Sequence, residues 1–349
     1  MKVMLFVPPG GYFAERWSHG TMMPALGLSY IAAVLERDGV EVELVPSHVL
    51  GLSFRDVARK IESERPDVVG ITTTTENRFQ SFKLASVAKE AHPRTFVVLG
   101  GPHLKNTGVD TLTHVPDIDA VVQGEGEETM RELCRALAAK SGLGAVNGLV
   151  WRDGAAVRSN PPRFLLPDLN MLPLPARHLE PWQAYNFTID VPGKGKLPAA
   201  NLMTSRGCPF TCTFCATPSN WGRKVRGLTA ENVVAEIEHV MDRYGAKAIW
   251  FFDDTFNYSR SRTERICDLI IERRLDISWY CEVRVDILTK PLLAKMRDSG
   301  LVYTGFGIES GSARICREII TKNATLKEAY DVIDWCNEQG GINGRQIVG

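Results

Sequence analysis

Short β-branched runs alternate with amphipathic helical patterns along almost the whole chain, and this alternation constrains the fold most. In the first 140 residues, the runs that we expect to form strands are 3–7, 40–45, 68–72, 96–99 and 120–123. Apolar residues recur at helical spacing in the segments that follow these runs, namely 26–37, 54–64, 81–91 and 127–139. Strand and helix repeated in this order predict an α/β fold with a doubly wound, Rossmann-like parallel sheet covered on both faces.

The second half of the chain alternates in the same way. Strands are expected at 199–203, 248–252, 279–284, 302–309 and 342–349. One helix should open at Thr229, and another at Thr325, where Glu328 completes a capping box. Successive βα units predict a (β/α) barrel or partial TIM barrel with its chemistry at the carboxyl ends of the strands. The sequence stops near the fifth strand, so we expect a truncated barrel that belongs to a longer protein.

A proline-rich segment joins the two halves. Asp153-Gly154 predicts a two-residue hairpin turn at its start. Eight of the nineteen prolines then fall within 161–198, which predicts an extended connector without regular structure. We therefore expect three parts, at 1–142, 143–198 and 199–349.

Three cysteines, Cys208, Cys212 and Cys215, fall within eight residues directly after an expected strand. Thiolates at this spacing bind soft metals, above all iron-sulfur clusters and zinc. A four-iron cluster normally takes four cysteines and no fourth lies nearby, so one iron would stay open to an outside ligand. The alternatives are a zinc site completed by a distant Cys or His, or a set of buried thiols. The sequence lacks the second Cys pair or the His pair of a typical structural zinc site.

The Cys-x3-Cys-x2-Cys pattern, with Phe214 just before the last cysteine, resembles the radical S-adenosylmethionine (SAM) enzymes. The resemblance implies that the three cysteines hold a [4Fe-4S] cluster whose open iron binds SAM, beside Phe214. It also implies that an electron from the cluster cleaves SAM to methionine and a 5′-deoxyadenosyl radical. A reductant such as flavodoxin or ferredoxin would supply that electron.

Charged and polar residues follow the expected strands of the second half. Charges at the ends of buried strands are costly unless a ligand or a partner uses them. By the same resemblance, Asp253 and Asp254 meet the amino group of SAM, Arg284 meets its carboxylate, and Glu309 or Ser310 holds its ribose. The alternative is a ring of mutual ion pairs, with Arg284 bound to Glu282 or Glu309.

Glycine- and threonine-rich loops follow the expected strands of the first half, beginning with Pro8-Pro9-Gly10-Gly11. Glycine lets a ligand approach the backbone, and hydroxyl and amide groups can hold phosphate or amide groups. A nicotinamide dinucleotide is rejected because no Gly-x-Gly-x-x-Gly follows the first strand.

With the cysteine motif downstream, these loops resemble the cobalamin-binding domain that precedes many radical SAM domains. The resemblance implies cobalamin contacts at Thr72, Thr73, Thr74, Gly100, Gly101, His103, Gly124, Glu125 and Gly126. The Asp-x-His-x-x-Gly signature of many cobalamin enzymes is absent, and radical SAM relatives commonly hold cobalamin without it. Tight βα turns are the alternative explanation for the glycines.

The resemblance implies a small-molecule substrate, and composition gives no support for other classes of partner. The 41 basic and 41 acidic side chains cancel, which argues against a nucleic-acid partner. No apolar run reaches eighteen residues, so no membrane span is expected. Eight unevenly spaced cysteines without a secretory signal favour a reducing cytoplasm.

Taken together, the resemblance implies a cobalamin-dependent radical SAM enzyme. The main expectation is a methyltransferase acting on an unactivated carbon or phosphorus, in which the radical removes hydrogen and methylcobalamin donates the methyl group. One alternative is a radical SAM enzyme that forms or rearranges a ring without net methylation. The other is a non-catalytic sensor that binds cobalamin or metal. No catalytic acid or base is assigned.

Overall fold

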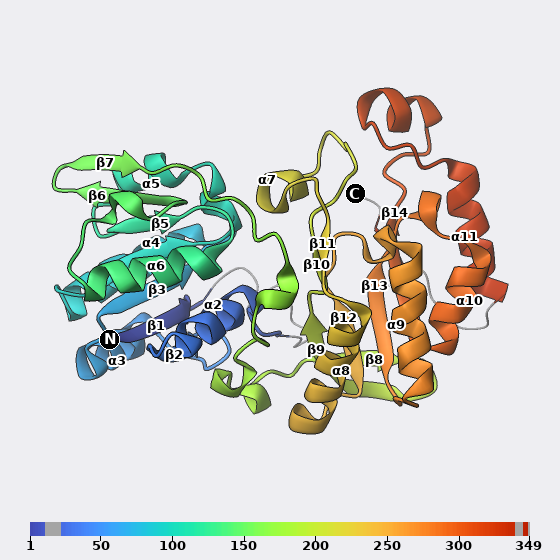
Figure 1. Cartoon of the computed structure of the whole chain (residues 1–349), viewed down its shortest axis with the longest axis horizontal. Helices are drawn as coiled ribbons and strands as arrows, with labels where there is room; N and C mark the ends of the chain where they lie inside the picture. Colours follow the sequence, from blue (N-terminus) through green and yellow to red (C-terminus); the bar gives the residue numbers. More distant parts are fainter. Residues whose placement is uncertain (11–21, 339–344, 348–349) are drawn as a thin grey trace. The chain divides into compact units, whose positions relative to one another are not determined.

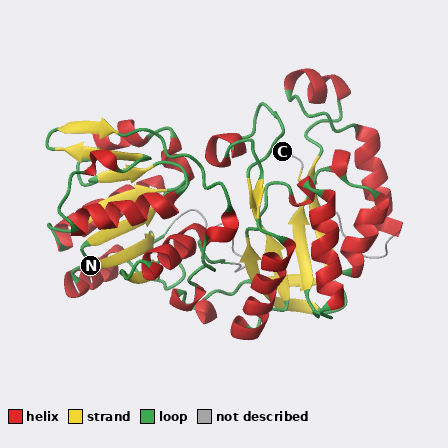
Figure 2. Ribbon diagram, viewed as in Figure 1, coloured by secondary structure: helices red, strands yellow, loops and turns green. Residues whose placement is uncertain are grey.

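The computed structural model describes residues 1–10, 22–338 and 345–347, and the chain divides into two compact units. The first unit comprises residues 1–166 and 172–186, and the second comprises 167–171 and 187–349. Both units are mixed α/β, as Figure 2 shows.

The first unit is built on a seven-stranded sheet in the order β2-β1-β3-β4-β5-β6-β7. Its strands are β1 (Lys2–Val7), β2 (Glu41–Pro46), β3 (Val68–Thr72), β4 (Phe96–Gly100), β5 (Ala120–Val122), β6 (Leu149–Asp153) and β7 (Ala156–Ser159). Strands β1 to β5 pair in parallel, and the chain reverses direction across the sheet between β1 and β3. The predicted doubly wound parallel sheet is confirmed, and its switch point lies at the carboxyl ends of β1 and β3.

Helices cover both faces of this sheet (Figure 1). They are α2 (Leu26–Arg37), α3 (Phe54–Glu64), α4 (Arg78–Ala91), α5 (Gly108–His114) and α6 (Gly126–Ala138), with short 3-10 turns η1 (Pro102–Lys105) and η2 (Leu143–Ala145). One core cluster joins α2 and α6 to the sheet, and a second joins α3, α4 and α5 to the opposite face. The sequence did not predict α5, because its seven residues are too few to establish a helical period.

The hairpin of β6 and β7 extends this sheet, since β6 pairs antiparallel with β5. The predicted turn is displaced by one residue: Asp153 pairs with Ala156, so the turn residues are Gly154 and Ala155. Gly154 has φ of +60°, which glycine adopts without strain.

The connector contains more regular structure than the sequence predicted. It forms three 3-10 turns, η3 (Leu169–Met171), η4 (Arg177–Leu179) and η5 (Trp182–Ala184), and then strand β8 (Thr188–Val191). Strand β8 pairs antiparallel with the start of β9, around a turn at residues 192–194. The expectation of an irregular segment up to residue 198 was therefore wrong, because the density of prolines obscured the alternating pattern of β8.

The second unit carries a six-stranded sheet in the order β15-β14-β13-β12-β9-β8. Its strands after β8 are β9 (Gly195–Leu202), β12 (Ala248–Phe251), β13 (Ser278–Glu282), β14 (Leu301–Gly307) and β15 (Arg345–Ile347). These five strands pair in parallel and in the order of the sequence, as successive units of a barrel do. The predicted partial barrel is thus confirmed. Of the strand expected at 342–349, residues 345–347 lie within the described part of the chain.

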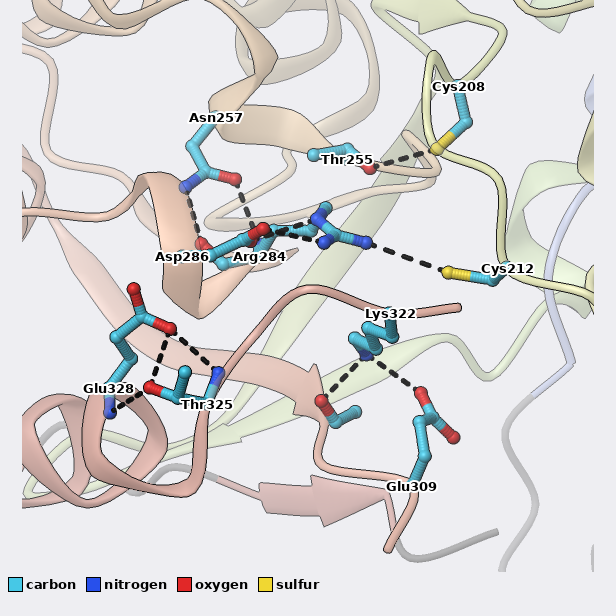
Figure 3. A network of polar contacts seen from close by, with 11 residues as sticks. Cys208, Cys212, Thr255, Asn257, Arg284, Asp286, Glu309, Lys322, Thr325 and Glu328 are labelled. Carbon is cyan, nitrogen blue, oxygen red and sulfur yellow. Dashed lines mark hydrogen bonds and ion pairs between the residues drawn. The ribbon is translucent and has the colours of Figure 1, made fainter. Parts of the chain in front are cut away.

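Helices between these strands are α8 (Ala230–Tyr244), α9 (Arg260–Glu272), α10 (Lys290–Asp298) and α11 (Leu326–Glu338), with η6 (Phe256–Tyr258) and η7 (Val285–Ile287) at strand ends. Thr229 caps α8 by accepting a hydrogen bond from Asn232 N–H, as predicted. The Thr325 and Glu328 capping box of α11 is also confirmed and is drawn in Figure 3. Within the described ranges, no helix has both the length and the apolar character needed to cross a membrane.

Candidate functional site

The three predicted cysteine ligands lie on a loop that a small β-ladder closes at its base. Strand β10 (Ser205–Arg206) pairs antiparallel with β11 (Arg226–Gly227), and helix α7 (Thr217–Trp221) lies between them in the sequence. Gly207 opens the loop with φ of +100°, and a Cβ there would lie 2.6 Å from the Lys224 carbonyl oxygen. The turn into the cysteine loop therefore requires glycine at this position.

The thiols of this loop are more accessible than the other five. Cys208, Cys212 and Cys215 are half-buried, whereas every other cysteine is buried. Burial raises the pKa of Cys134 to about 12 and that of Cys267 to about 11, so these thiols stay protonated and unreactive. The loop cysteines are therefore the thiols placed to bind a metal.

Two of the three loop sulfurs lie near residues that follow strands of the second unit (Figure 3). Cys208 Sγ lies 3.7 Å from Thr255 Oγ1, and Arg284 Nη1 donates to Cys212 Sγ at 3.7 Å. Across the described residues, no three His, Cys, Asp or Glu side chains are arranged to hold a metal ion. The donor set of three accessible thiols fits an iron-sulfur cluster, whose thiolates bind different irons and so need not surround one ion.

The cysteine loop is also fastened to the segment after β14, which contains the π-helix η8 (Ile315–Ile319). Thr213 donates its N–H to Ile320 O at 3.0 Å and its hydroxyl to Ile319 O at 2.9 Å. Thr321 Oγ1 donates to Thr211 O at 2.5 Å. Phe214, predicted beside SAM, is 60% exposed on this loop.

Asp253 ties the end of β12 to the start of β10. Its carboxylate accepts hydrogen bonds from Thr204 N–H, Thr204 Oγ1 and Ser205 Oγ, each at 2.6 Å, and the side chain is buried. Arg262 donates in turn to Thr204 O at 3.0 Å and Thr204 Oγ1 at 2.8 Å. The Asp253 carboxylate is thus occupied within the protein.

Asp254, its neighbour, is exposed. It accepts a hydrogen bond from Thr217 Oγ1 at 2.8 Å and one from the Gly207 N–H. The surrounding protein desolvates the carboxylate and raises the pKa of Asp254, although both hydrogen bonds favour the charged form. Asp254 is therefore the member of the pair that a cation such as an amino group can reach.

Arg284 follows β13 and is held by Asp286, not by Glu282 or Glu309. Its Nε and Nη2 donate to the two Asp286 carboxylate oxygens at 2.9 and 2.7 Å. Glu282 instead accepts a hydrogen bond from Tyr280 OH, and burial raises the pKa of Glu282. The partners named for Arg284 in the ion-pair alternative were therefore wrong, although Arg284 does form an ion pair, with Asp286.

Glu309 and Ser310 lie just after β14. Glu309 pairs with the buried Lys322 at 2.8 Å, and Lys322 also donates to Gly307 O at 2.8 Å (Figure 3). Glu309 has φ of +67°, a conformation that costs a non-glycine residue about 1–3 kcal/mol and is typical of functional sites. Ser310 Oγ accepts a hydrogen bond from Ser312 N–H at 3.1 Å.

In the first unit, the predicted loops after β3 and β4 are brought together. Thr73 N–H donates to Gly100 O at 2.7 Å, and His103 N–H donates to Thr73 O at 3.3 Å. A Cβ at Gly101, where φ is +112°, would lie 2.5 Å from Thr73 O. The Thr73 hydroxyl is fully buried, and no described group pairs with it. An unpaired hydroxyl at the switch point suits a ligand rich in amides, as cobalamin is.

The loop after β5 joins the same edge of the sheet. Gln123 Nε2 donates to Lys105 O at 2.9 Å, which links the end of β5 to η1. Glu125, predicted to contact cobalamin, is buried and accepts a hydrogen bond from Leu166 N–H at 2.7 Å. Gly124 (φ +86°) and Gly126 flank it. Thr72 and Thr74 lie beside Thr73, while Gly11 of the first loop lies outside the described residues.

Sequence reasoning missed most of the partners in these networks, among them Thr204, Thr217, Asp286 and Lys322. Asp286 follows Arg284 by two positions, and an acidic residue this close to a functional arginine is a signal that could have been used. Lys322 lies thirteen residues after Glu309, with no local pattern linking the two. Only the folded chain brings them together.

Two protein-family models match the chain, one in each half. The B12 binding domain model matches residues 18–134, and the Radical SAM superfamily model matches residues 202–349. The second match includes all three cysteines of the loop.

Individual relatives share both regions. The chain is 36% identical over 340 residues to the uncharacterized methyltransferase PH0819 of Pyrococcus horikoshii. The aligned region covers 97% of this chain and 72% of that relative. It is 29% identical over 353 residues to the anaerobic magnesium-protoporphyrin IX monomethyl ester cyclase of Rubrivivax gelatinosus, covering 99% of this chain and 62% of the cyclase.

Solved structures share this fold. The radical S-adenosylmethionine methyltransferase TsrM of Kitasatospora setae, with cobalamin and a [4Fe-4S] cluster bound, matches with a TM-score of 0.79 at 16% identity. That match covers 99% of this chain and 66% of TsrM. The chain thus spans between 62% and 72% of the length of these three proteins.

Proposed function

The chain belongs to the radical SAM family whose members carry an N-terminal B12 binding domain, and on that premise we propose that it is a cobalamin-dependent methyltransferase. The acceptor is an unactivated carbon or phosphorus of a small molecule. When bound, a [4Fe-4S] cluster with SAM would supply the radical chemistry, and cobalamin would supply the methyl group. The electron comes from a reductant such as flavodoxin or ferredoxin.

The second unit would hold the cluster and SAM. Cys208, Cys212 and Cys215 provide the thiolates, and their accessibility on one loop, against five buried thiols, is the observation that carries the proposal. Arg284 is fixed with its guanidinium beside that loop, so we assign it to the SAM carboxylate. Asp254 is assigned to the amino group, because Asp253 is occupied by Thr204 and Ser205.

The ribose would lie at the segment after β14. Glu309 is held by Lys322 in its left-handed conformation, which fixes the direction of its carboxylate. Ser310 adds a hydroxyl next to it, and Phe214 offers an exposed ring on the cysteine loop. In the first unit, cobalamin would lie over the loops that follow β3, β4 and β5, around Thr73 and Gly101.

A reducing, cytoplasmic setting fits this proposal. All eight cysteines are free, and an open iron-sulfur cluster is sensitive to oxygen.

The test is product analysis on anaerobically reconstituted protein supplied with SAM, cobalamin, a reductant and candidate acceptors. Methyl transfer predicts a methylated acceptor together with S-adenosylhomocysteine and 5′-deoxyadenosine. The Cys212→Ala variant should yield none of the three. Turnover by wild-type protein with neither S-adenosylhomocysteine nor methylated product would contradict the methyltransferase proposal.

A second candidate is ring formation without net methylation. It is favoured by the similarity to the Rubrivivax gelatinosus cyclase, which extends over 99% of this chain. For that reaction the same assay should give 5′-deoxyadenosine alone, and the acceptor should lose hydrogen without gaining mass from a methyl group.

A further inference from the structure

Two neighbouring residues, Asp286 and Asn257, fix the side chain and the backbone of Arg284. Nε and Nη2 donate to the two oxygens of Asp286 at 2.9 and 2.7 Å. Asn257 holds the backbone on both sides: its Nδ2 donates to Arg284 O at 3.0 Å, and Arg284 N–H donates to Asn257 Oδ1 at 3.0 Å. Arg284 is only 8% exposed, so this arrangement is shielded from water.

The fixed guanidinium meets the cysteine loop at two points. Its carbon lies 3.5 Å from the centroid of the Phe210 ring, a cation-π contact. Its Nη1 donates to Cys212 Sγ at 3.7 Å, as Figure 3 shows. One arginine of the loop after β13 therefore contacts both an aromatic residue and a predicted metal ligand of the cysteine loop.

Asp286 determines this direction. A guanidinium is a rigid planar fork with five N–H groups, so fixing Nε and Nη2 on one carboxylate also fixes where Nη1 points. Nη1 carries two N–H groups, which leaves one for a carboxylate such as that of SAM while the other faces sulfur. A lysine could carry the same charge but could not be aimed in this way.

We propose that Asp286 is a positioning residue that aims one Arg284 N–H at the Cys212 sulfur and thereby raises the reduction potential of the cluster bound there. The inference rests on the proposed function, since it requires a cluster on the cysteine loop. Hydrogen bonds to ligating sulfurs and local charge set the potential of iron-sulfur clusters. A donor at sulfur stabilises the reduced form, which carries the extra negative charge.

The test uses variants that conserve charge, because removing the carboxylate or the guanidinium would shift the potential by charge alone. Asp286→Glu displaces the acceptor oxygens, and Arg284→Lys removes the fork. Asp276→Glu is the matched control, since Asp276 forms an exposed pair with Lys194 at 3.0 Å. Each protein is reconstituted anaerobically without SAM, and its iron content, thermal midpoint and cluster midpoint potential are measured.

For Asp286→Glu we expect the ratio of reduced to oxidised cluster at a fixed potential to fall roughly tenfold. For a one-electron couple, this corresponds to a midpoint potential about 59 mV more negative. Arg284→Lys should shift in the same direction, and Asp276→Glu should match wild type. If Asp286→Glu loads poorly, Arg284→Lys decides the question.

Wild-type potentials in both loaded variants would overturn this inference and leave the proposed function standing. Failure of wild-type protein itself to take up iron and sulfide would overturn both. The two failures are therefore distinguishable in one set of measurements.

Discussion

At the scale of single residues, accessibility separates the cysteines that can bind metal from those that pack the core. Changing Cys208, Cys212 or Cys215 to Ala should abolish iron uptake, because each change removes one of the three thiolates and the loop contains no other cysteine. The buried Cys134→Ala variant is the control and should bind iron as wild type does. Iron and sulfide analysis after anaerobic reconstitution gives the answer. Iron uptake by all three loop variants would exclude the loop as the cluster site.

Gly101 is the residue at which a single added carbon should matter most in the first unit. Gly101→Ala would force φ of +112° on a residue with a side chain and place its Cβ 2.5 Å from Thr73 O. We expect the free energy of unfolding to fall by about 1–3 kcal/mol, measured by urea denaturation. Gly27→Ala, in α2 with open space around its Cβ, should raise it by about 0.5–1 kcal/mol. Equal stabilities for the two variants would show that the contact between the loops is not tight.

At the scale of elements, the connector is anchored to α2 by a buried carboxyl group. Glu180 accepts hydrogen bonds from Ser29 Oγ at 2.7 Å and Tyr185 OH at 2.6 Å, and all three side chains are buried. Burial raises the pKa of Glu180 above its usual 4.5 in spite of these bonds. The folded protein therefore holds this proton to higher pH than the unfolded chain does.

Because of Glu180, the free energy of unfolding should decrease as the pH rises. Above about pH 4.5 the unfolded chain releases this proton, while the folded protein still holds it. The free energy of unfolding therefore falls as the pH rises towards the pKa of Glu180 in the folded protein. The loss is about 1.4 kcal/mol for each tenfold difference in proton affinity between the two states. Glu180→Gln mimics the neutral form and should gain stability relative to wild type over this range. Urea unfolding from pH 4 to 8 measures it, with the exposed Glu62→Gln as control for losing one carboxylate. A constant difference at all pH values would contradict the assignment.

Elements were predictable from the sequence where the pattern was long and regular. Helices α2 and α3 begin and end at the predicted residues, because their apolar period spans three turns. The seven residues of α5 and the four of β8 were missed, since neither establishes a period. Among the candidate site residues, the cysteines and Arg284 could be proposed from the sequence because they lie in a motif or at a strand end. Lys322 could not, because its contact with Glu309 is made by tertiary folding.

At the scale of the whole molecule, the two units carry separate candidate sites, each with its own core. Cobalamin uptake should therefore survive loss of the cluster. A variant with all three loop cysteines changed to Ala should bind cobalamin with wild-type affinity while lacking iron, as absorbance of the desalted protein would show. Loss of cobalamin together with iron would mean that the first unit does not hold the cofactor by itself.

The central claim is that three sulfurs hold a cluster with one iron left open for SAM. Its most direct measurement is the electron paramagnetic resonance spectrum of the dithionite-reduced, anaerobically reconstituted protein with and without SAM, together with metal analysis. We expect about four iron atoms per chain and a reduced-cluster signal whose g values shift when SAM is added. A tetrahedral zinc in place of iron, or a cluster signal that SAM leaves unchanged, would contradict it.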